Sequence, residues 1–174
     1  ISIYDDAINK GTHTLNPWQM EQAYQFGARR YTAKNPYRLA LVAANGSGKD
    51  KYVIAPFTLW FILTRLDATC IVTSSSAQQL DTQTERYIKR LSFAINAAHG
   101  EEILRVVKRH IYCTKTHSEI ILFATDEPGK AEGYHPVTPD AELAIVANEA
   151  KSIPDGIFES LLRCSGYSFW LEVS

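Results

Sequence analysis

The chain has 174 residues, of which 45% are hydrophobic and 21% charged, and this length and composition predict one globular domain with a core of its own. Its 18 basic and 19 acidic residues leave a formal net charge of -1, which excludes a uniformly basic surface of the kind that binds DNA or anionic membrane permanently. The cysteines are odd in number and lie far apart in apolar stretches, which predicts buried, reduced thiols at Cys70, Cys113 and Cys164.

We expect a soluble protein that is neither secreted nor in contact with a membrane. The N-terminus lacks the basic region and apolar run of a secretory signal. The longest apolar stretch, Val53 to Leu63, is interrupted by Pro56 and Thr58 and is shorter than the ~20 residues that span a bilayer. No repeat or linker divides the chain, so residues 1–174 are predicted to form a single domain, and its end directly after an apolar run predicts that it is part of a longer protein.

The predicted elements begin with a helix in the N-terminal segment, residues 1–35. Asn16 is a candidate N-cap and Pro17 suits the first helical position, so the helix is expected from Pro17 to about Tyr31. The next elements are a strand, a glycine turn and a second helix, expected at Arg38 to Ala44, 45–48 and Lys49 to about Arg65.

The rest of the chain continues to alternate strands and helices. A strand at Ala68 to Thr73 precedes a polar helix at Ala77 to about Ala98, and the strands His110 to Thr114 and Glu119 to Thr125 are predicted to form a hairpin. The last elements are a strand, a helix and a strand at Leu143 to Ala147, Pro154 to Arg163 and Phe169 to Val173. This order predicts an α/β fold with a mostly parallel central sheet and helices on both faces.

The segment from Ala43 to Asp50, AANGSGKD, has the spacing and the strand-to-helix context of a phosphate loop (P-loop). Glycines let successive backbone N–H groups turn inward around an anion, and Lys49 can reach the β- and γ-phosphates of a nucleotide. The predicted nucleotide-binding residues here are Asn45, Gly46, Ser47, Gly48, Lys49 and Asp50. Asp50 departs from the motif, which has a Mg²⁺-binding Ser or Thr at this position. The alternative is a glycine turn that merely connects strand to helix.

A second motif, Leu143 to Ala150, is a buried strand that ends in Asn148 and Glu149. In P-loop enzymes such a strand ends in an acidic residue near Mg²⁺, followed by a Glu that orients or deprotonates the attacking water. Glu149 fits the second role and, with Lys49, is predicted to be catalytic. Asn148 stands where an Asp is expected. We hypothesise that Asp50 and Asn148 are metal ligands in exchanged positions; the rival is that these changes disable hydrolysis.

A third motif precedes the loop. Gln19 on the first helix is positioned to read adenine through paired amide hydrogen bonds, and Trp18 or Tyr24 offers a stacking face for the base. The alternative is an ordinary capped helix with a tryptophan in the core.

Together these motifs resemble the ATPase domain of the large subunit of tailed-bacteriophage terminases. The residues that carry the resemblance span nearly the whole chain: Pro17 to Gln19, Ala44 to Lys49, Ile71 to Ser76, Gln78 and Gln79, Glu132 to His135, and Ala147 to Ile153. The resemblance implies a three-layer, P-loop NTPase-like fold that binds ATP and Mg²⁺ and hydrolyses ATP to move double-stranded DNA into a capsid. It assigns base reading to Gln19, phosphate contact to Lys49 and catalysis to Glu149, and puts Asn148 at the metal position.

The resemblance also implies partners. It predicts a homo-oligomeric ring on a portal protein, a small terminase subunit, transient contact with double-stranded DNA, and work in the cytoplasm of an infected bacterium. The nuclease domain of the family has no residues in this chain. Arg105 and Arg109 are candidates by position for an arginine that completes a neighbour's site, the alternative being arginines on a solvated face. The loop Gly129 to His135 is expected near nucleotide or DNA, or else as plain surface.

Two other functions remain open at this point. One is a nucleotide-binding or assembly module that does not hydrolyse ATP, which Asp50 and Asn148 favour. The other is a helicase-like P-loop ATPase acting on nucleic acid.

Overall fold

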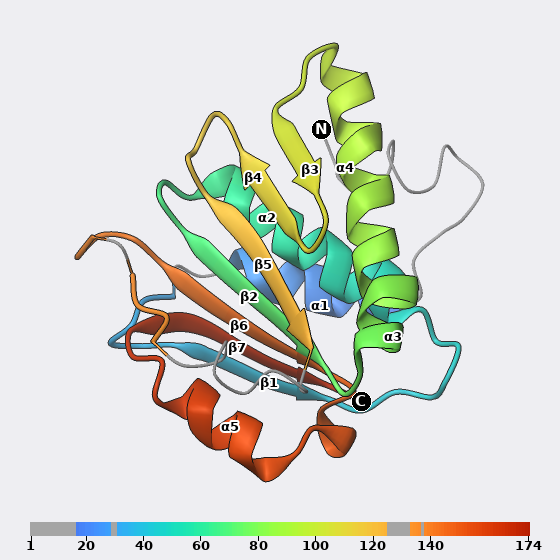
Figure 1. The fold of residues 1–174 in the computed structure, drawn as a ribbon, viewed down its shortest axis with the longest axis vertical. Helices are drawn as coiled ribbons and strands as arrows, with labels where there is room; N and C mark the ends of the chain where they lie inside the picture. The colour runs from blue at the N-terminus through green and yellow to red at the C-terminus, as the bar shows by residue number, and fades with distance from the viewer. Residues whose placement is uncertain (1–16, 29–30, 125–132, 137) are drawn as a thin grey trace.

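The computed structural model describes residues 17–28, 31–124, 133–136 and 138–174 (Figure 1). The strands are β1 (Tyr37–Leu41), β2 (Thr69–Ser74), β3 (Leu104–Val107), β4 (His110–Cys113), β5 (Glu119–Ala124), β6 (Leu143–Asn148) and β7 (Tyr167–Val173). The helices are α1 (Pro17–Ala28), α2 (Ala55–Thr64), α3 (Ala77–Gln79), α4 (Glu85–His99) and α5 (Asp155–Leu162), with π-helical turns η2 (Asp50–Ile54) and η3 (Leu80–Thr84) and a 3-10 turn η5 (Ala150–Ser152).

The described strands form one sheet in the order β1-β7-β6-β2-β5-β4-β3. The neighbouring strands β1, β7, β6, β2 and β5 run parallel to one another. At the other side of the sheet, β4 pairs antiparallel with both β5 and β3. The central strands β2 and β6 are buried along their whole length, as expected for parallel strands covered on both faces. The prediction of a mostly parallel α/β sheet is confirmed, and so is the hairpin of β4 and β5.

Helices cover both faces of the sheet, unevenly (Figure 1). The larger core lies under α1, α2 and α4, where α2 is buried almost throughout and α4 turns Ile88, Leu91 and Ile95 inward. The smaller core packs α5 against the other face through Ile157 and Leu161. This three-layer arrangement places the carboxyl ends of the parallel strands along one open edge, where α/β sheets bind their ligands.

Several predicted boundaries shifted. The first helix ends at Ala28 and residues 29–30 lie outside the described part, as do Asn16 and most of the loop 129–135. Strand β3 was not predicted, because Ile103 to Cys113 is one apolar-rich run in the sequence; it is divided by a turn at which Arg109 adopts a φ of +56°. The two long helices each begin with a π turn or contain one, which hydrophobic spacing does not reveal.

Two further expectations concern cysteines and membranes. Cys70, Cys113 and Cys164 are buried free thiols, as predicted, and burial raises the pKa of the Cys70 thiol well above its ordinary value, which keeps it neutral. In the described part of the chain, none of the helices has the length and apolarity needed to cross a bilayer.

Candidate functional site

The segment between β1 and η2 forms a glycine turn at the carboxyl edge of the sheet. Gly46 and Gly48 adopt φ angles of +78° and +81°, which glycine reaches without the steric penalty of a Cβ atom. The ring of Tyr52 packs against the turn, so a Cβ atom on Gly48 would lie 2.6 Å from Cδ2 of that ring. The Tyr52 N–H also donates to the Gly48 carbonyl at 2.8 Å. The turn is therefore held against the start of the following helix.

Replacing Gly48 with alanine is expected to destabilise the fold more than the same change at Gly46. Both variants place a side chain at positive φ, but a Cβ atom on Gly46 meets nothing within 4 Å, whereas on Gly48 it overlaps Tyr52. The overlap adds about 1–3 kcal/mol to the loss of unfolding free energy. Chemical denaturation of the two variants measures the difference, and equal losses would contradict the packing of Tyr52 on the loop.

Lys49 connects the glycine turn to the end of β6. Its side chain is only 5% exposed, and its Nζ lies 3.3 Å from Oε1 of Glu149 and 3.5 Å from the carbonyl oxygen of Ala43. Lys49 and Glu149 are 100 positions apart in the sequence and were predicted to share one site. The structure brings them into direct contact at the carboxyl ends of the strands.

Glu149 occupies an unusual backbone conformation directly after β6. Its φ of +53° and ψ of +46° are left-handed, a region that few residues other than glycine adopt and that concentrates at functional sites. The side chain is 15% exposed and lines the same cavity as the glycine turn. The backbone thus turns this carboxylate out of the strand direction and toward Lys49.

Asp50, Thr84 and Asn148 form a closed triangle of hydrogen bonds beside Lys49. The Thr84 hydroxyl and the Asn148 amide nitrogen both donate to Oδ1 of Asp50, each at 2.7 Å. The third side is the Asn148 amide nitrogen donating to the Thr84 hydroxyl oxygen at 2.9 Å. The two residues that depart from the P-loop motifs therefore touch each other, as the exchange hypothesis requires.

The orientation of the Asn148 amide follows from its neighbours. Its Oδ1 accepts a hydrogen bond from the Glu149 N–H at 3.0 Å, and its nitrogen faces Asp50, whose ionised carboxylate can only accept. A flipped amide would face a donor with its nitrogen and an acceptor with its oxygen. Asn148 therefore meets Asp50 through nitrogen, whereas a metal ligand at this position would use its amide oxygen.

The pKa of Asp50 is raised above its ordinary value. Burial is the largest cause and the nearby Glu149 carboxylate adds to it, whereas the hydrogen bonds from Thr84 and Asn148 and the charge of Lys49 lower it. Asp50 is thus a carboxylate whose charge is costly in this position and is maintained by donors and a cation placed around it.

Gln19 reaches the glycine turn from α1. It is 1% exposed, and its Nε2 donates to the Ser47 carbonyl at 3.1 Å. Trp18 is partly buried against the larger core, as the alternative of a core tryptophan predicts, and it does not line the cavity beside the turn. Tyr24 is 70% exposed. Gln19 does not line that cavity either, and its hydrogen bond to Ser47 is what connects it to the loop.

The site opens into a cavity of about 540 Å³. Its lining combines the glycine turn, the end of β6 and the helices that follow β2: Asn45, Gly46, Gly48, Lys49, Asp50, Lys51, Gln79, Gln83, Tyr87, Glu149 and Lys151. Its lining contains three lysines and two carboxylates, and lysines and the peptide N–H groups of such a turn are groups that bind anions in proteins.

The sequence did not single out five of the lining residues as site residues. Gln79, Gln83 and Tyr87 follow one another at four-residue spacing, which places polar groups on one helix face and is a signal that was available. Lys51 directly follows the predicted site residue Asp50, and Lys151 lies two positions after Glu149. Nothing in the sequence indicates that the helical segment with Gln79, Gln83 and Tyr87 approaches the loop.

The two candidate trans-acting arginines lie away from this cavity. Arg109, in the turn between β3 and β4, binds Oδ1 of Asp81 through Nε at 2.9 Å, and this contact lowers the pKa of Asp81. Its backbone N–H also donates to the Glu85 carboxylate. Arg105 is exposed on β3 at the outer edge of the sheet. The role of either in a neighbouring site stays a prediction.

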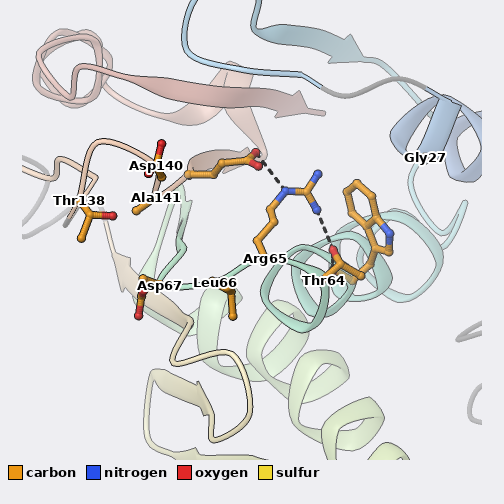
Figure 2. Close-up of a pocket in the computed structure, with 10 residues that line it drawn as sticks. Gly27, Thr64, Arg65, Leu66, Asp67, Thr138, Asp140 and Ala141 are labelled. Atoms are coloured by element: carbon orange, nitrogen blue, oxygen red, sulfur yellow. Dashed lines mark hydrogen bonds and ion pairs between the residues drawn. The ribbon is translucent and has the colours of Figure 1, made fainter.

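A second cavity, of about 780 Å³, lies at the opposite end of the strands, where Asp67 and Glu142 precede β2 and β6 (Figure 2). Figure 2 shows the Arg65 guanidinium with a dashed line to Thr64, and its Nε donates to Oε2 of Glu142. It bonds Glu142 at 3.0 Å and packs on the rings of Trp60, Phe61 and Phe169, whose centroids lie 4.3 to 5.2 Å from its Cζ. These contacts join α2 to the sheet.

Arg65→Lys is expected to destabilise the protein by about 1–2 kcal/mol, because lysine keeps the charge but loses the planar stacking on three rings. The surface pair of Lys115 and Glu101, both more than half exposed, provides the matched control, and Lys115→Arg should leave the unfolding free energy nearly unchanged. Urea denaturation reports both values. Equal effects would show that Arg65 acts only as a charge.

No protein-family model matches the chain, and no curated protein matches it. Solved structures do. The large terminase of the thermophilic bacteriophage D6E matches with a TM-score of 0.67 and 14% identity over 92% of this chain and 39% of that chain. The HK97 bacteriophage large terminase matches with a TM-score of 0.67 and 15% identity over 99% and 36%. A mutant ATPase domain of the Thermus phage P74-26 large terminase gives 0.52 and 14% over 79% and 58%.

The chain therefore spans about two fifths of the length of the D6E terminase. That terminase has also been solved in complex with ADP and with ATP-gamma-S, and these complexes match with TM-scores of 0.64 and 0.62. At 12 to 15% identity the similarity concerns the arrangement of strands and helices. This chain has the fold of the ATPase domain of bacteriophage large terminases.

Proposed function

We propose that the chain is the ATP-hydrolysing motor domain of a viral DNA-packaging terminase, with ATP bound in the cavity beside residues 45–50. The observation that carries the proposal is the contact between Lys49 and Glu149 at the glycine turn. It joins the cation that neutralises phosphates to the carboxylate that activates water, on a fold shared with terminases of which one has been solved with ADP and ATP-gamma-S.

The roles of the residues follow from their chemistry. The N–H groups of the glycine turn receive the phosphates, and Lys49 exchanges its contact with Glu149 for the β- and γ-phosphate oxygens. This exchange leaves the Glu149 carboxylate as the acceptor for a proton of the attacking water. Gln19, held against Ser47, lies where α1 meets the loop and is assigned to the base.

The residues present fit a Mg²⁺ ion that arrives with the nucleotide. The described residues contain no group of three or more His, Cys, Asp or Glu side chains able to hold a metal by themselves. Mg²⁺ bound to a nucleotide needs only one or two carboxylates, because phosphates and water complete its octahedron. Asp50 lines the cavity and offers such a carboxylate. The ion would neutralise charge developing on the phosphates.

The partners and the cellular setting follow from the terminase assignment. We propose a homo-oligomeric ring that acts on double-stranded DNA with a portal protein and a small subunit, in the cytoplasm of the infected bacterium. The near-neutral charge of the chain suits contacts with DNA that form and break in each cycle. In such a ring Arg105, exposed at the sheet edge, meets a neighbour more readily than Arg109, which Asp81 holds.

A second candidate is a nucleotide-binding module without hydrolysis. The orientation of the Asn148 amide favours it, since the end of β6 then offers nitrogen to the metal position rather than a carboxylate oxygen. Both candidates require nucleotide binding and differ only in turnover.

Isothermal titration of the chain with ADP and with ATP-gamma-S in Mg²⁺ tests the binding that the two candidates share. We expect saturable binding at one site per chain, with no heat from a nucleoside that lacks phosphates. Absence of binding by either nucleotide at millimolar concentration would overturn the assignment of the loop.

A further inference from the structure

Thr84 is a buried residue that enters the site from outside both nucleotide-binding motifs. It is the last residue of η3, it is fully buried, and its hydroxyl donates to Oδ1 of Asp50 at 2.7 Å. Asp50 is itself the first residue of η2. Both π turns thus place a terminal residue in the same hydrogen bond, and π turns are rare features that recur at functional sites.

The hydrogen bonds divide the Asp50 carboxylate into two unlike oxygens. Oδ1 accepts from both Thr84 and Asn148, whereas Oδ2 accepts no hydrogen bond from the residues that the structure describes. Two donors on one oxygen fix the rotation of the carboxylate about its last torsion angle. They also favour its ionised form, because each donor stabilises negative charge.

The same hydrogen bonds compensate for the departure of the loop from its motif. A P-loop has a hydroxyl after its lysine, and here the carboxylate of Asp50 stands in that place. A hydroxyl is supplied instead by Thr84, from the helical segment after β2. This hydroxyl contacts Asp50, the residue that occupies the Ser or Thr position of the motif. Asn148 contacts the same oxygen through nitrogen and so holds the carboxylate as well.

We propose that Thr84 is a positioning residue of the cation site, which fixes the Asp50 carboxylate so that its second oxygen is available to the Mg²⁺ of a bound nucleotide. This inference rests on the proposed function. It assigns the protein's cation ligand to Asp50 alone and gives Asn148 the role of a second positioning residue, in place of the exchanged pair of ligands expected from the sequence.

The test separates the cation from the nucleotide. The affinity for ADP is measured by titration in EDTA and again in Mg²⁺, and the ratio of the two dissociation constants gives the contribution of the cation. The variants are Thr84→Val, which keeps the shape without the hydroxyl, Thr84→Ala as a second hydroxyl-free variant, and Thr84→Ser, which keeps the hydroxyl. Mn²⁺ binding to the ADP complex, followed by electron paramagnetic resonance, provides an independent readout.

We expect similar ADP affinities in EDTA for all four proteins. In Mg²⁺ the gain in affinity should fall about tenfold in Thr84→Val and Thr84→Ala, as the loss of a hydrogen bond to a charged group predicts, and return in Thr84→Ser. An unchanged gain in the hydroxyl-free variants, or an equal loss in EDTA and Mg²⁺, would overturn the role of Thr84. A wild type that binds no ADP in either condition would instead overturn the proposed function, and this assignment with it.

Discussion

Lys49→Ala is expected to weaken the binding of ATP-gamma-S by a factor on the order of 100 or more. The variant removes the only lysine that lies both in the glycine turn and within reach of Glu149 among the described residues. Charge-assisted hydrogen bonds contribute about 1.5–3 kcal/mol each, and every 1.4 kcal/mol changes a dissociation constant about tenfold. Loss of contacts to two phosphates therefore corresponds to a factor on the order of 100 or more.

The cavity provides a matched control for this experiment. Lys51 carries the same charge and lines the same space, but its Nζ packs on the ring of Tyr52 and bonds the Tyr52 hydroxyl. Lys51→Ala should weaken binding only a few-fold, because it removes general positive charge and no direct phosphate contact. Titration of both variants, with thermal unfolding to show that each is folded, decides the matter. Equal losses would mean that the cavity attracts anions without a dedicated lysine.

Glu149→Gln is expected to lower ATP turnover about 100-fold or more while nucleotide binding is kept. A general base contributes a factor of about 10² to 10⁴, and glutamine has the shape of glutamate without its basicity. Binding should become tighter, if it changes, because Lys49 no longer has a carboxylate that competes with the phosphates. The left-handed backbone at position 149 strains both side chains equally, so the backbone cost does not change, whereas the loss of the carboxylate beside buried Lys49 should lower the unfolding free energy of the nucleotide-free protein.

Turnover is measured as phosphate release at saturating ATP. Glu159→Gln, which changes an exposed carboxylate on α5 by the same single group, is the control and should hydrolyse ATP like the wild type. Equal turnover in wild type and Glu149→Gln would assign the base to another residue. Loss of binding together with turnover would show that Glu149 acts through the structure of the site.

The sequence predicts the parts of this fold that depend on local patterns. Strand β6 begins with an uninterrupted apolar run, and β2 is rich in β-branched residues. Parallel strands require helical connections between them, so the positions of both strands and the sheet type follow. The glycine loop and the end of β6 match sequence motifs whose residue spacing is set by phosphate binding and catalysis. Because the strands are parallel, Lys49 and Glu149 come together at the carboxyl ends of the strands.

Other parts depend on contacts that have no local pattern. A short edge strand such as β3, in which Leu104 is buried and Val106 half-buried, is continuous in the sequence with the apolar residues of β4. Thr84 lies in a polar helical stretch where one more threonine carries no signal, and a π turn, which hydrophobic spacing does not reveal, brings its hydroxyl to Asp50. Arg109 could be chosen by position, but its ion pair with Asp81 depends on a turn that was not predicted.

The most direct test of the account is a single turnover of ATP by the wild-type chain. Excess protein is incubated with radiolabelled ATP and Mg²⁺ and then denatured, and the nucleotide is identified. We expect ADP from the wild type, at a protein concentration that lets chains associate, and intact ATP from Glu149→Gln, because the proposed function assigns phosphate contact to Lys49 and water activation to Glu149. Bound but intact ATP in the wild type would contradict it and select the module that binds nucleotide without hydrolysis.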